Sequence, residues 1–182
     1  GSYSGEILEV HSNIFKLHTI HHRNPGKWIR SIIHSQQKVF CFTDGGIFVN
    51  YAKSLQAYSP IRNRLENVQS KGAVQLNDSI ILSGGLNGIC KINTITEELV
   101  PFSTNKIRVT TLASIDKKDI IYFGSTNGLY KYSLKKADLT PRKIQNSILN
   151  NRIISLCTTK DSLLWVAIAG HGIVIMKQDK II

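Results

Sequence analysis

The sequence predicts an all-β chain built from repeats of one unit of four short antiparallel strands. Short apolar stretches rich in β-branched and aromatic residues alternate with turns of Gly, Asn, Asp and Ser, a pattern typical of strands. A helical period of 3.6 residues is not sustained anywhere in the chain. The third observation is a recurrence of about 42 residues in the order of strands and turns.

The recurrence is clearest in an apolar strand, a turn, and a glycine that opens a second apolar strand. The four copies are "VFCFTDGGIFVNY" from Val39, "IILSGGLNGICKI" from Ile80, "IIYFGSTNGLYKY" from Ile120 and "LLWVAIAGHGIVIM" from Leu163. The strand-opening glycines, with an earlier member at Gly5, are Gly5, Gly46, Gly88, Gly128 and Gly172, separated by 41, 42, 40 and 44 residues. We expect a third strand to begin near each, because glycine accepts the positive φ of a sharp turn.

Two further apolar stretches flank these copies and predict the first and the fourth strand of each unit. The first strands are "WIRSIIHS", "GAVQL", "IRVTTLASI" and "NRIISLCT", and the fourth strands are "SLQAYSP", "EELVPFS" and "DLTPRKI". Four-stranded units of roughly 40 to 45 residues have the period of a β-propeller blade. The sequence therefore predicts blades that stack face to face, since a lone blade leaves an apolar face uncovered.

The number of units predicts a fragment of a larger propeller. Gly1-Ser2 has the look of a cloning scar, and we expect residues 3–182 to form one partial propeller domain. Gly5 opens only the second half of a blade, three full units follow, and the chain ends soon after the third strand of the last unit. This makes about four blades. Their open ends would expose apolar faces and unpaired edges, which favours self-association or a homodimer.

The repeat resembles the two-component regulator propeller repeat, whose pattern is Asn-x-Val-x-Ser-Ile, a polar turn, and Leu-Trp-Ile-Gly-Thr-x-x-Gly-Leu. The last unit matches at Asn151, Ile153, Ser155, Leu156, Leu164, Trp165, Val166, Gly172 and Ile173. The third unit matches at Val109, Thr111, Leu112, Ile121, Tyr122, Phe123, Gly124, Ser125, Asn127, Gly128, Leu129 and Tyr130. The first two units match at Ser31, Ile32, Gly46 and Ile47, and at Val74, Leu82, Gly88 and Ile89. Ala167 stands where the pattern has its first glycine.

This resemblance implies a function in signal input. Repeats of this family form the extracytoplasmic sensor region of bacterial hybrid two-component histidine kinases, many of which detect oligosaccharides released from complex glycans. The implied location is the periplasm. The implied module is not an enzyme, and the kinase and regulator domains would lie outside these 182 residues.

The charge of the chain favours polyanions without choosing among them. A net charge of +11 comes from 23 Lys and Arg against 12 Asp and Glu. Such a charge raises the local concentration of nucleic acid, acidic polysaccharide or lipid headgroups. The basic residues are scattered, so a solvated surface is the simpler interpretation, and we expect no nucleic-acid partner. No apolar run is long enough for a membrane-spanning helix.

Catalytic, cofactor and metal sites are not predicted. The chain has no Gly-x-Ser-x-Gly elbow, no His-Glu-x-x-His motif and no phosphate-binding loop. His21 and His22 are adjacent and have no carboxylate or Cys near them in sequence, which argues against a metal site. Cys41, Cys90 and Cys157 lie singly in apolar stretches, and we expect all three to be buried. We also expect Trp165 to pack in the core, since it aligns with Tyr122 and Phe40 in the second strands.

Two groups of residues are candidates for ligand binding. The first lies in the turns between second and third strands: Asp44, Asn87, Asn127 and His171. The second lies at the starts of the first strands, where the units align Trp28, Arg108 and Arg152 in one column, with Arg30 two positions further on. In propellers these two regions share a face that commonly carries the ligand site. The planar guanidinium groups of Arg can bind carboxylate or sulfate groups, and an exposed Trp ring can stack on a sugar, so these residues could bind an acidic or sulfated oligosaccharide. The alternatives are that the first group forms turns and that the arginines are simply solvated.

Three functions therefore remain open at this stage. The leading prediction is a ligand-sensing module, followed by a protein interaction scaffold and by a lyase or hydrolase acting on sugars. A sensor is stabilised by a glycan without turnover, a scaffold binds a protein instead, and an enzyme consumes the oligosaccharide.

Overall fold

The computed structural model describes most of the chain. Backbone and side chains are described for residues 28–35, 38–49, 69–96, 98–102, 106–115, 119–135 and 140–182, and backbone alone for strand residues 6–11, 14–19, 50–51 and 54–57. Gly5, His21, His22 and the Gly1-Ser2 pair lie outside the described residues.

The structure confirms the all-β prediction and the four-stranded antiparallel unit. Blade 1 is β3 (Ile29–Ser35), β4 (Lys38–Thr43), β5 (Gly46–Tyr51) and β6 (Ser54–Ala57). Blade 2 is β7 (Ser70–Asn77), β8 (Ile80–Gly85), β9 (Gly88–Asn93) and β10 (Leu99–Pro101). Blade 3 is β11 (Val109–Ile115), β12 (Ile120–Ser125), β13 (Gly128–Ser133) and β14 (Arg142–Lys143). Blade 4 is β15 (Ile153–Thr158), β16 (Leu164–Ile168), β17 (Gly172–Lys177) and β18 (Lys180–Ile181). A separate pair, β1 (Glu6–His11) and β2 (Ile14–Thr19), precedes blade 1.

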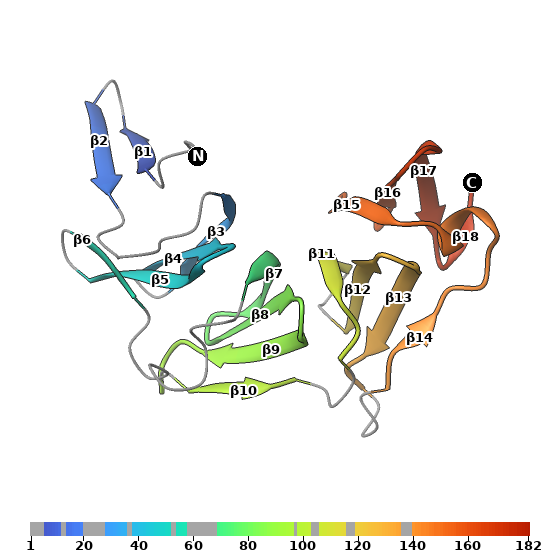
Figure 1. Ribbon diagram of the computed structural model, residues 1–182, viewed down its shortest axis with the longest axis horizontal. Helices are drawn as coiled ribbons and strands as arrows, with labels where there is room; N and C mark the ends of the chain where they lie inside the picture. The colour runs from blue at the N-terminus through green and yellow to red at the C-terminus, as the bar shows by residue number, and fades with distance from the viewer. Residues whose placement is uncertain are drawn as a thin grey trace.

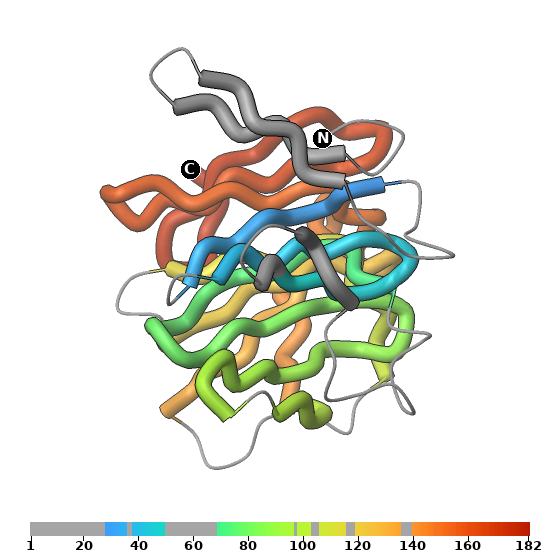
Figure 2. The backbone as a smooth tube through the Cα atoms, turned by 90° about the vertical axis from the view of Figure 1, so that its left-hand side faces the viewer, coloured from blue at the N-terminus to red at the C-terminus, as the bar shows by residue number. Residues whose placement is uncertain are grey.

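The blades follow one another along an arc rather than a closed ring (Figure 1). Figure 2 views this arc from the side on which blade 1 lies, so that blade 4 lies behind it. Within each blade the strands pair in chain order, so the first strand lies at one edge of the sheet. The first strands of neighbouring blades pack on each other, β3 on β7, β7 on β11 and β11 on β15. They line the concave side of the arc (Figure 1).

The third strand of every blade begins at a glycine in a left-handed conformation. The φ angles are +146° at Gly46, +96° at Gly88, +138° at Gly128 and +79° at Gly172. An L-residue rarely adopts such angles, so the glycine is required by the turn that reverses the chain between the second and third strands.

Three apolar layers hold the blades together. Blade 1 meets blade 2 through Phe40, Phe42, Ile47, Val49, Ile81 and Ile92. Blade 2 meets blade 3 through Leu82, Ile89, Val109, Leu112, Ile121 and Phe123. Blade 3 meets blade 4 through Ala113, Tyr122, Leu129, Ile153, Val166 and Ile168. Because the strands alternate, blades 2 and 3 each bury one face against the previous blade and the other against the next.

Close approach at one of these layers explains the first glycine of the repeat pattern. A Cβ added to Gly124 would lie 2.7 Å from Cβ of Ile153 in the next blade, well inside a normal contact. The aligned residue of blade 4 is Ala167, on the side of the sheet that no described blade covers. Ala167 therefore meets none of the crowding that requires glycine at Gly124.

The last blade corrects one expectation. The chain does not stop after the third strand of this unit, because β18 adds a fourth strand that pairs Met176 with Ile181. The connection is a two-residue turn in which Gln178 and Asp179 have φ of +48° and +66°. Positive φ at both central residues is the type I′ geometry that matches the twist of a hairpin.

The burial expected for Trp165 and Cys157 is wrong. Trp165 is 40% exposed, and Cys157 is exposed, whereas Cys41 and Cys90 are buried as expected. Cys157, Trp165 and Ile175 form one cross-strand row, and Ala167 pairs with Ile173 in the next. These five residues are here called the free face of blade 4. They are equivalent to the residues of blade 3 that pack on blade 4. Cys157, Trp165 and Ile173 are exposed, and Ala167 and Ile175 partly so, because no described strand covers that side of the last sheet.

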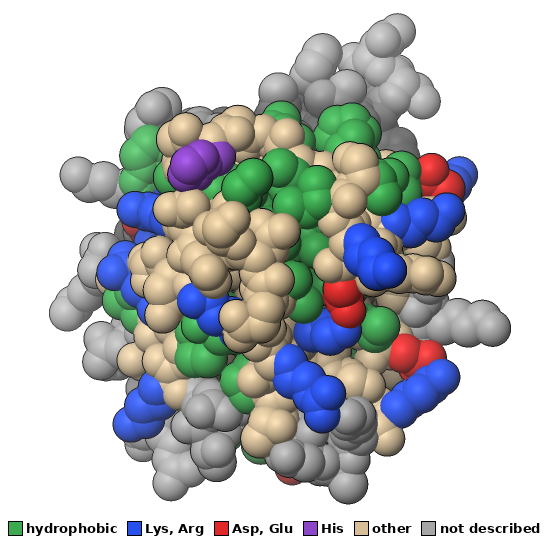
Figure 3. Space-filling view, turned by 90° about the vertical axis from the view of Figure 1, so that its right-hand side faces the viewer, with side chains coloured by type: hydrophobic (Ala, Val, Ile, Leu, Met, Phe, Trp, Pro, Cys, Tyr) green, Lys and Arg blue, Asp and Glu red, His purple; other side chains and the backbone are tan. Residues whose placement is uncertain are grey.

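The side of the molecule on which blade 4 lies is shown in Figure 3. Hydrophobic side chains gather in the upper part of this surface, while Lys and Arg side chains are spread over the remainder. Over the described part of the chain, no helix has the length and hydrophobicity needed to cross a membrane.

Candidate ligand-binding site

A β-bulge recurs at the same place in the first strand of every blade. The register shifts between Ile29 and Ser31, between Ser70 and Gly72, between Val109 and Thr111, and between Ile153 and Ser155. The residues left without a cross-strand partner are Arg30, Lys71, Thr110 and Ile154. A bulge changes the direction of its side chain, and these four lie on the strands that line the concave side of the arc.

In blades 1 and 4 the turn between the second and third strands contacts the start of the first strand. In blade 1 the backbone N–H of Trp28 donates to Oδ1 of Asp44 at 3.0 Å, and the N–H of Asp44 donates to the carbonyl of Trp28 at 3.2 Å. In blade 4 the N–H of Ala169, in the turn that carries His171, donates to the carbonyl of Arg152 at 2.9 Å. The turns between second and third strands thus share one end of the blades with the starts of the first strands.

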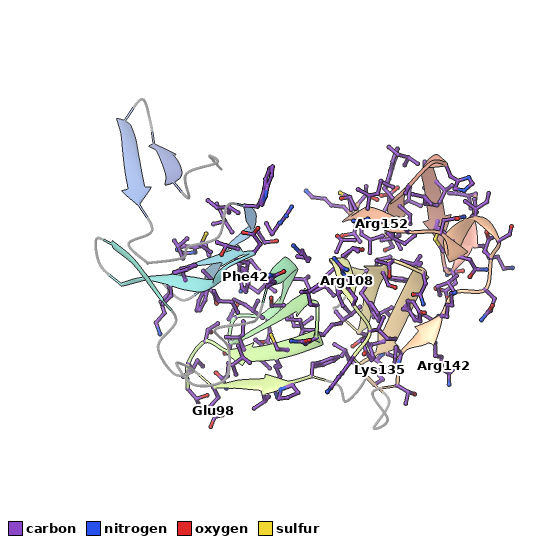
Figure 4. The ribbon with its side chains drawn as sticks, viewed as in Figure 1. Phe42, Glu98, Arg108, Lys135, Arg142 and Arg152 are labelled. Atoms are coloured by element: carbon purple, nitrogen blue, oxygen red, sulfur yellow. The ribbon has the colours of Figure 1, made fainter. Side chains whose placement is uncertain are left out.

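The predicted basic residues lie around the concave side. Arg108 and Arg152 are both exposed. They lie beside β11 and β15, on the concave side of the arc (Figure 4). Arg30 is exposed as well, and its guanidinium carbon lies 5.4 Å from the centroid of the Trp28 ring. Trp28 is 42% exposed, so the ring combines a cation contact with accessible apolar surface.

Lys71 joins this group and is missing from the sequence-based candidates. It occupies the bulge of β7, which lies between β3 and β11. Burial lowers the pKa of the Lys71 ammonium, and the positive charges of Arg30 and Arg108 lower it further, while Asp44 opposes them. Lys71 is therefore close enough to three of the predicted site residues to sense their charges. We call Arg30, Lys71, Arg108 and Asp44 the charged cluster.

The remaining turn residues behave differently from one another. Oδ1 of Asn127 accepts hydrogen bonds from the hydroxyls of Ser125 at 2.5 Å and Tyr130 at 3.2 Å, which favours the role of a turn former. Asn87 and His171 are exposed in their turns. No contact of these three residues with the charged cluster is observed.

The cluster is suited to anions and not to metal ions. It contains three cations and one carboxylate, and the described residues include no group of three or more His, Cys, Asp or Glu placed to hold a metal. Arg side chains bind carboxylate and sulfate through a planar fork of donors, and Lys adds a point charge.

Solved structures with the same fold support the propeller assignment. The extracellular domain of BT4673 from B. thetaiotaomicron, described as a one component or hybrid two component system, matches 97% of this chain and 22% of its own, with 20% identity and a TM-score of 0.73. The WD40 β-propeller domain of Doa1 matches 99% of this chain and 60% of its own, with 13% identity and a TM-score of 0.73. Virginiamycin B lyase from Staphylococcus aureus matches 98% of this chain and 62% of its own, with 14% identity and a TM-score of 0.73.

These likenesses establish the fold. The chain is a fragment of a β-propeller, and it spans about a fifth of the length of the BT4673 domain. The repeat pattern resembles that of hybrid two-component systems, and BT4673 is described as one in one of its two structures. No protein-family model and no curated protein matches the sequence.

Proposed function

We propose that the chain is part of the signal-input propeller of a hybrid two-component histidine kinase, located outside the cytoplasm, in the periplasm. The observation that carries this proposal is that each of the four first strands, which line the concave side, has a basic residue in it or immediately before it, with the exposed Trp28 beside Arg30. The repeat pattern and the similarity to the extracellular domain of BT4673 agree with it.

The ligand that fits this surface is an oligosaccharide with acidic groups. A sugar ring can stack on the apolar face of Trp28, while Arg108 and Arg152 can each bind a carboxylate or a sulfate. Recognition of such a ligand requires no chemistry on it. The module would report occupancy rather than turn its ligand over.

One screen separates this function from its alternatives. The full chain is incubated with acidic and neutral oligosaccharides, and both the melting temperature and the products are measured. A sensor shows a rise in melting temperature with an acidic oligosaccharide and no product. Consumption of the oligosaccharide would instead indicate an enzyme, as virginiamycin B lyase shares the fold. Absence of any response would favour a scaffold. Changing Arg108 and Arg152 to Ala should abolish the shift; an unchanged shift would exclude both residues from the site.

Self-association is a second proposal and rests on the free face of blade 4. Its residues match, position by position, those through which blade 3 packs on blade 4, and Trp165 and Ile173 are 40% and 64% exposed. A surface of this kind is normally covered by another sheet. We propose that a second copy of the chain covers it when no further blade is present.

A further inference from the structure

We propose that Arg30, Lys71 and Arg108 form one anion site, which binds a single carboxylate or sulfate group and links blades 1, 2 and 3. The inference that a sugar carries this group rests on the proposed function. The inference of the anion site itself rests on the positions and charges of the three residues. Lys71 is the central residue of the three, and nothing in the repeat pattern assigns it a role.

The position of the three side chains follows from the fold. Arg30 and Lys71 occupy equivalent bulges in β3 and β7, the first strands of adjacent blades. Arg108 immediately precedes β11, which packs on β7 from the other side. The inner strands of three consecutive blades therefore each supply one cation, and Lys71 lies between the other two.

Among the described residues that act on the charge of Lys71, cations outnumber carboxylates. Its ammonium is partly buried, and removing a cation from water is unfavourable unless an anion compensates. Burial, Arg30 and Arg108 all lower its pKa, and Asp44 is the group that opposes them. Oδ1 of Asp44 is already engaged by the N–H of Trp28. Three cations against one carboxylate leave an excess of two positive charges.

One bound oxyanion would relieve this repulsion. Each of the two guanidinium groups can donate paired hydrogen bonds to a carboxylate or sulfate, and the Lys71 ammonium can donate another. A sugar acid is favoured over a nucleic acid because Trp28, beside Arg30, offers its ring at one end of the site. A nucleic acid would need a longer track of phosphate contacts than these three residues provide.

The test compares two lysine variants of the full chain. Lys71→Met removes the charge and keeps most of the side-chain volume, while Lys160→Met removes one charge from an exposed turn as a matched control. Binding of inorganic sulfate, an oligogalacturonate, a sulfated disaccharide, a neutral cello-oligosaccharide and a short single-stranded DNA is measured by calorimetry at constant ionic strength. We expect Lys71→Met to weaken the anionic probes about tenfold or more, the loss typical of a charge-assisted hydrogen bond, and Lys160→Met to leave them unchanged.

Two further measurements keep the result interpretable. Lys71→Arg should retain binding, which distinguishes a lost charge from a damaged fold. In the unmodified chain, the pKa of the Lys71 ammonium, followed by NMR, should rise when sulfate is added, because an anion stabilises the charged form. An unchanged pKa, or equal affinity of Lys71→Met and the unmodified chain for every anion, would overturn the site.

The outcomes separate the site from the proposed function. If sulfate binds through Lys71 but no oligosaccharide binds, the anion site stands and the sugar-sensing function fails. If an acidic oligosaccharide binds equally well without Lys71, the function stands and the site fails. Tighter Lys71-dependent binding of DNA than of any sugar acid would overturn the assignment of the ligand class.

Discussion

The hydroxyl of Tyr122 in blade 3 donates a 2.6 Å hydrogen bond to Oδ1 of Asp179 in blade 4. The second carboxylate oxygen of Asp179 pairs with the ammonium of Lys131, which lies opposite Tyr122 on the neighbouring strand. Asp179 belongs to the type I′ turn that joins β17 to β18. One turn of the last blade thus fixes two strands of the blade before it.

Loss of this hydrogen bond should destabilise the chain. Tyr122→Phe leaves Asp179 with one donor fewer at a partly buried position, and we expect a loss of about 1.5–3 kcal/mol in the free energy of unfolding, as for hydrogen bonds to charged groups. Urea denaturation measures it. As a control, Asp119→Asn breaks the exposed pair with Lys135 and should cost less than about 1 kcal/mol. Equal effects of the two changes would contradict the role of Asp179 as an inter-blade contact.

A larger residue at Gly124 should force blades 3 and 4 apart. Gly124→Ala places its Cβ 2.7 Å from Cβ of Ile153, which is backbone-proximal and cannot easily move away. Overpacking of this kind typically costs about 1–3 kcal/mol. The control is Ala167→Gly, the reverse change at the aligned position of the free face, with an expected cost below about 1 kcal/mol. A tolerated Gly124→Ala variant, judged by its melting temperature, would show that the interface is looser than the structure indicates.

The three thiols should differ in reactivity. Cys157 is exposed and should react with a thiol reagent in the folded chain, whereas Cys41 and Cys90 are buried and should react only on unfolding. Counting modified thiols by mass spectrometry before and after denaturation checks this. Protection of Cys157 in the folded chain at high protein concentration would show that the free face is covered by a second copy.

Stability should fall at alkaline pH. Burial raises the pKa of Cys41 from 9.0 to about 12 and that of Cys90 from 9.0 to about 11. A thiol that holds its proton more tightly when folded stabilises the fold below its unfolded pKa, and this contribution is lost as pH rises toward the folded value. Each thiol should contribute a slope of at most about 1.4 kcal/mol per pH unit above pH 9. Denaturation across this range should show a shallower slope for Cys90→Ala than for the unmodified chain, and an equal slope would contradict the raised pKa of Cys90.

Self-association should depend on the free face of blade 4. Sedimentation velocity over a range of concentrations should show dimers or larger species for the unmodified chain. Replacing Ile173, 64% exposed, by Asp should shift the population to monomer, because a charge cannot be buried there without a partner. A matched Lys160→Asp change should have no effect. A chain that stays monomeric at every concentration would refute the proposal.

The sequence predicts the repeating scaffold well because each blade depends on local signals. Apolar alternation marks the strands, and a glycine at the turn is needed wherever φ is positive, so Gly46, Gly88, Gly128 and Gly172 coincide with strand starts. The fourth strand after Met176 is missed because it is two residues long and its turn has Gln178 and Asp179 in place of glycine.

Burial and the site are predicted less well, since both depend on what lies across the sheet. The pattern around Trp165 and Cys157 is that of a buried strand, and sequence periodicity does not say whether a neighbouring blade is present. Lys71 is missed for another reason. The first strand expected in the second unit, "GAVQL", begins at Gly72, whereas β7 begins at Ser70 and includes Lys71. The approach of Asp44 to Trp28, in contrast, follows from the connection of strands within a blade.

The bulges of the four first strands have one more consequence. These positions lie outside the cross-strand pairing, and this chain has Arg, Lys, Thr and Ile there; of these, the Thr110 hydroxyl donates to the carbonyl of Ile153 in the next blade at 2.6 Å. The side chain at this position can therefore differ from blade to blade while the four-stranded framework stays the same. A new specificity would require a few substitutions on one rim and no redesign of the protein.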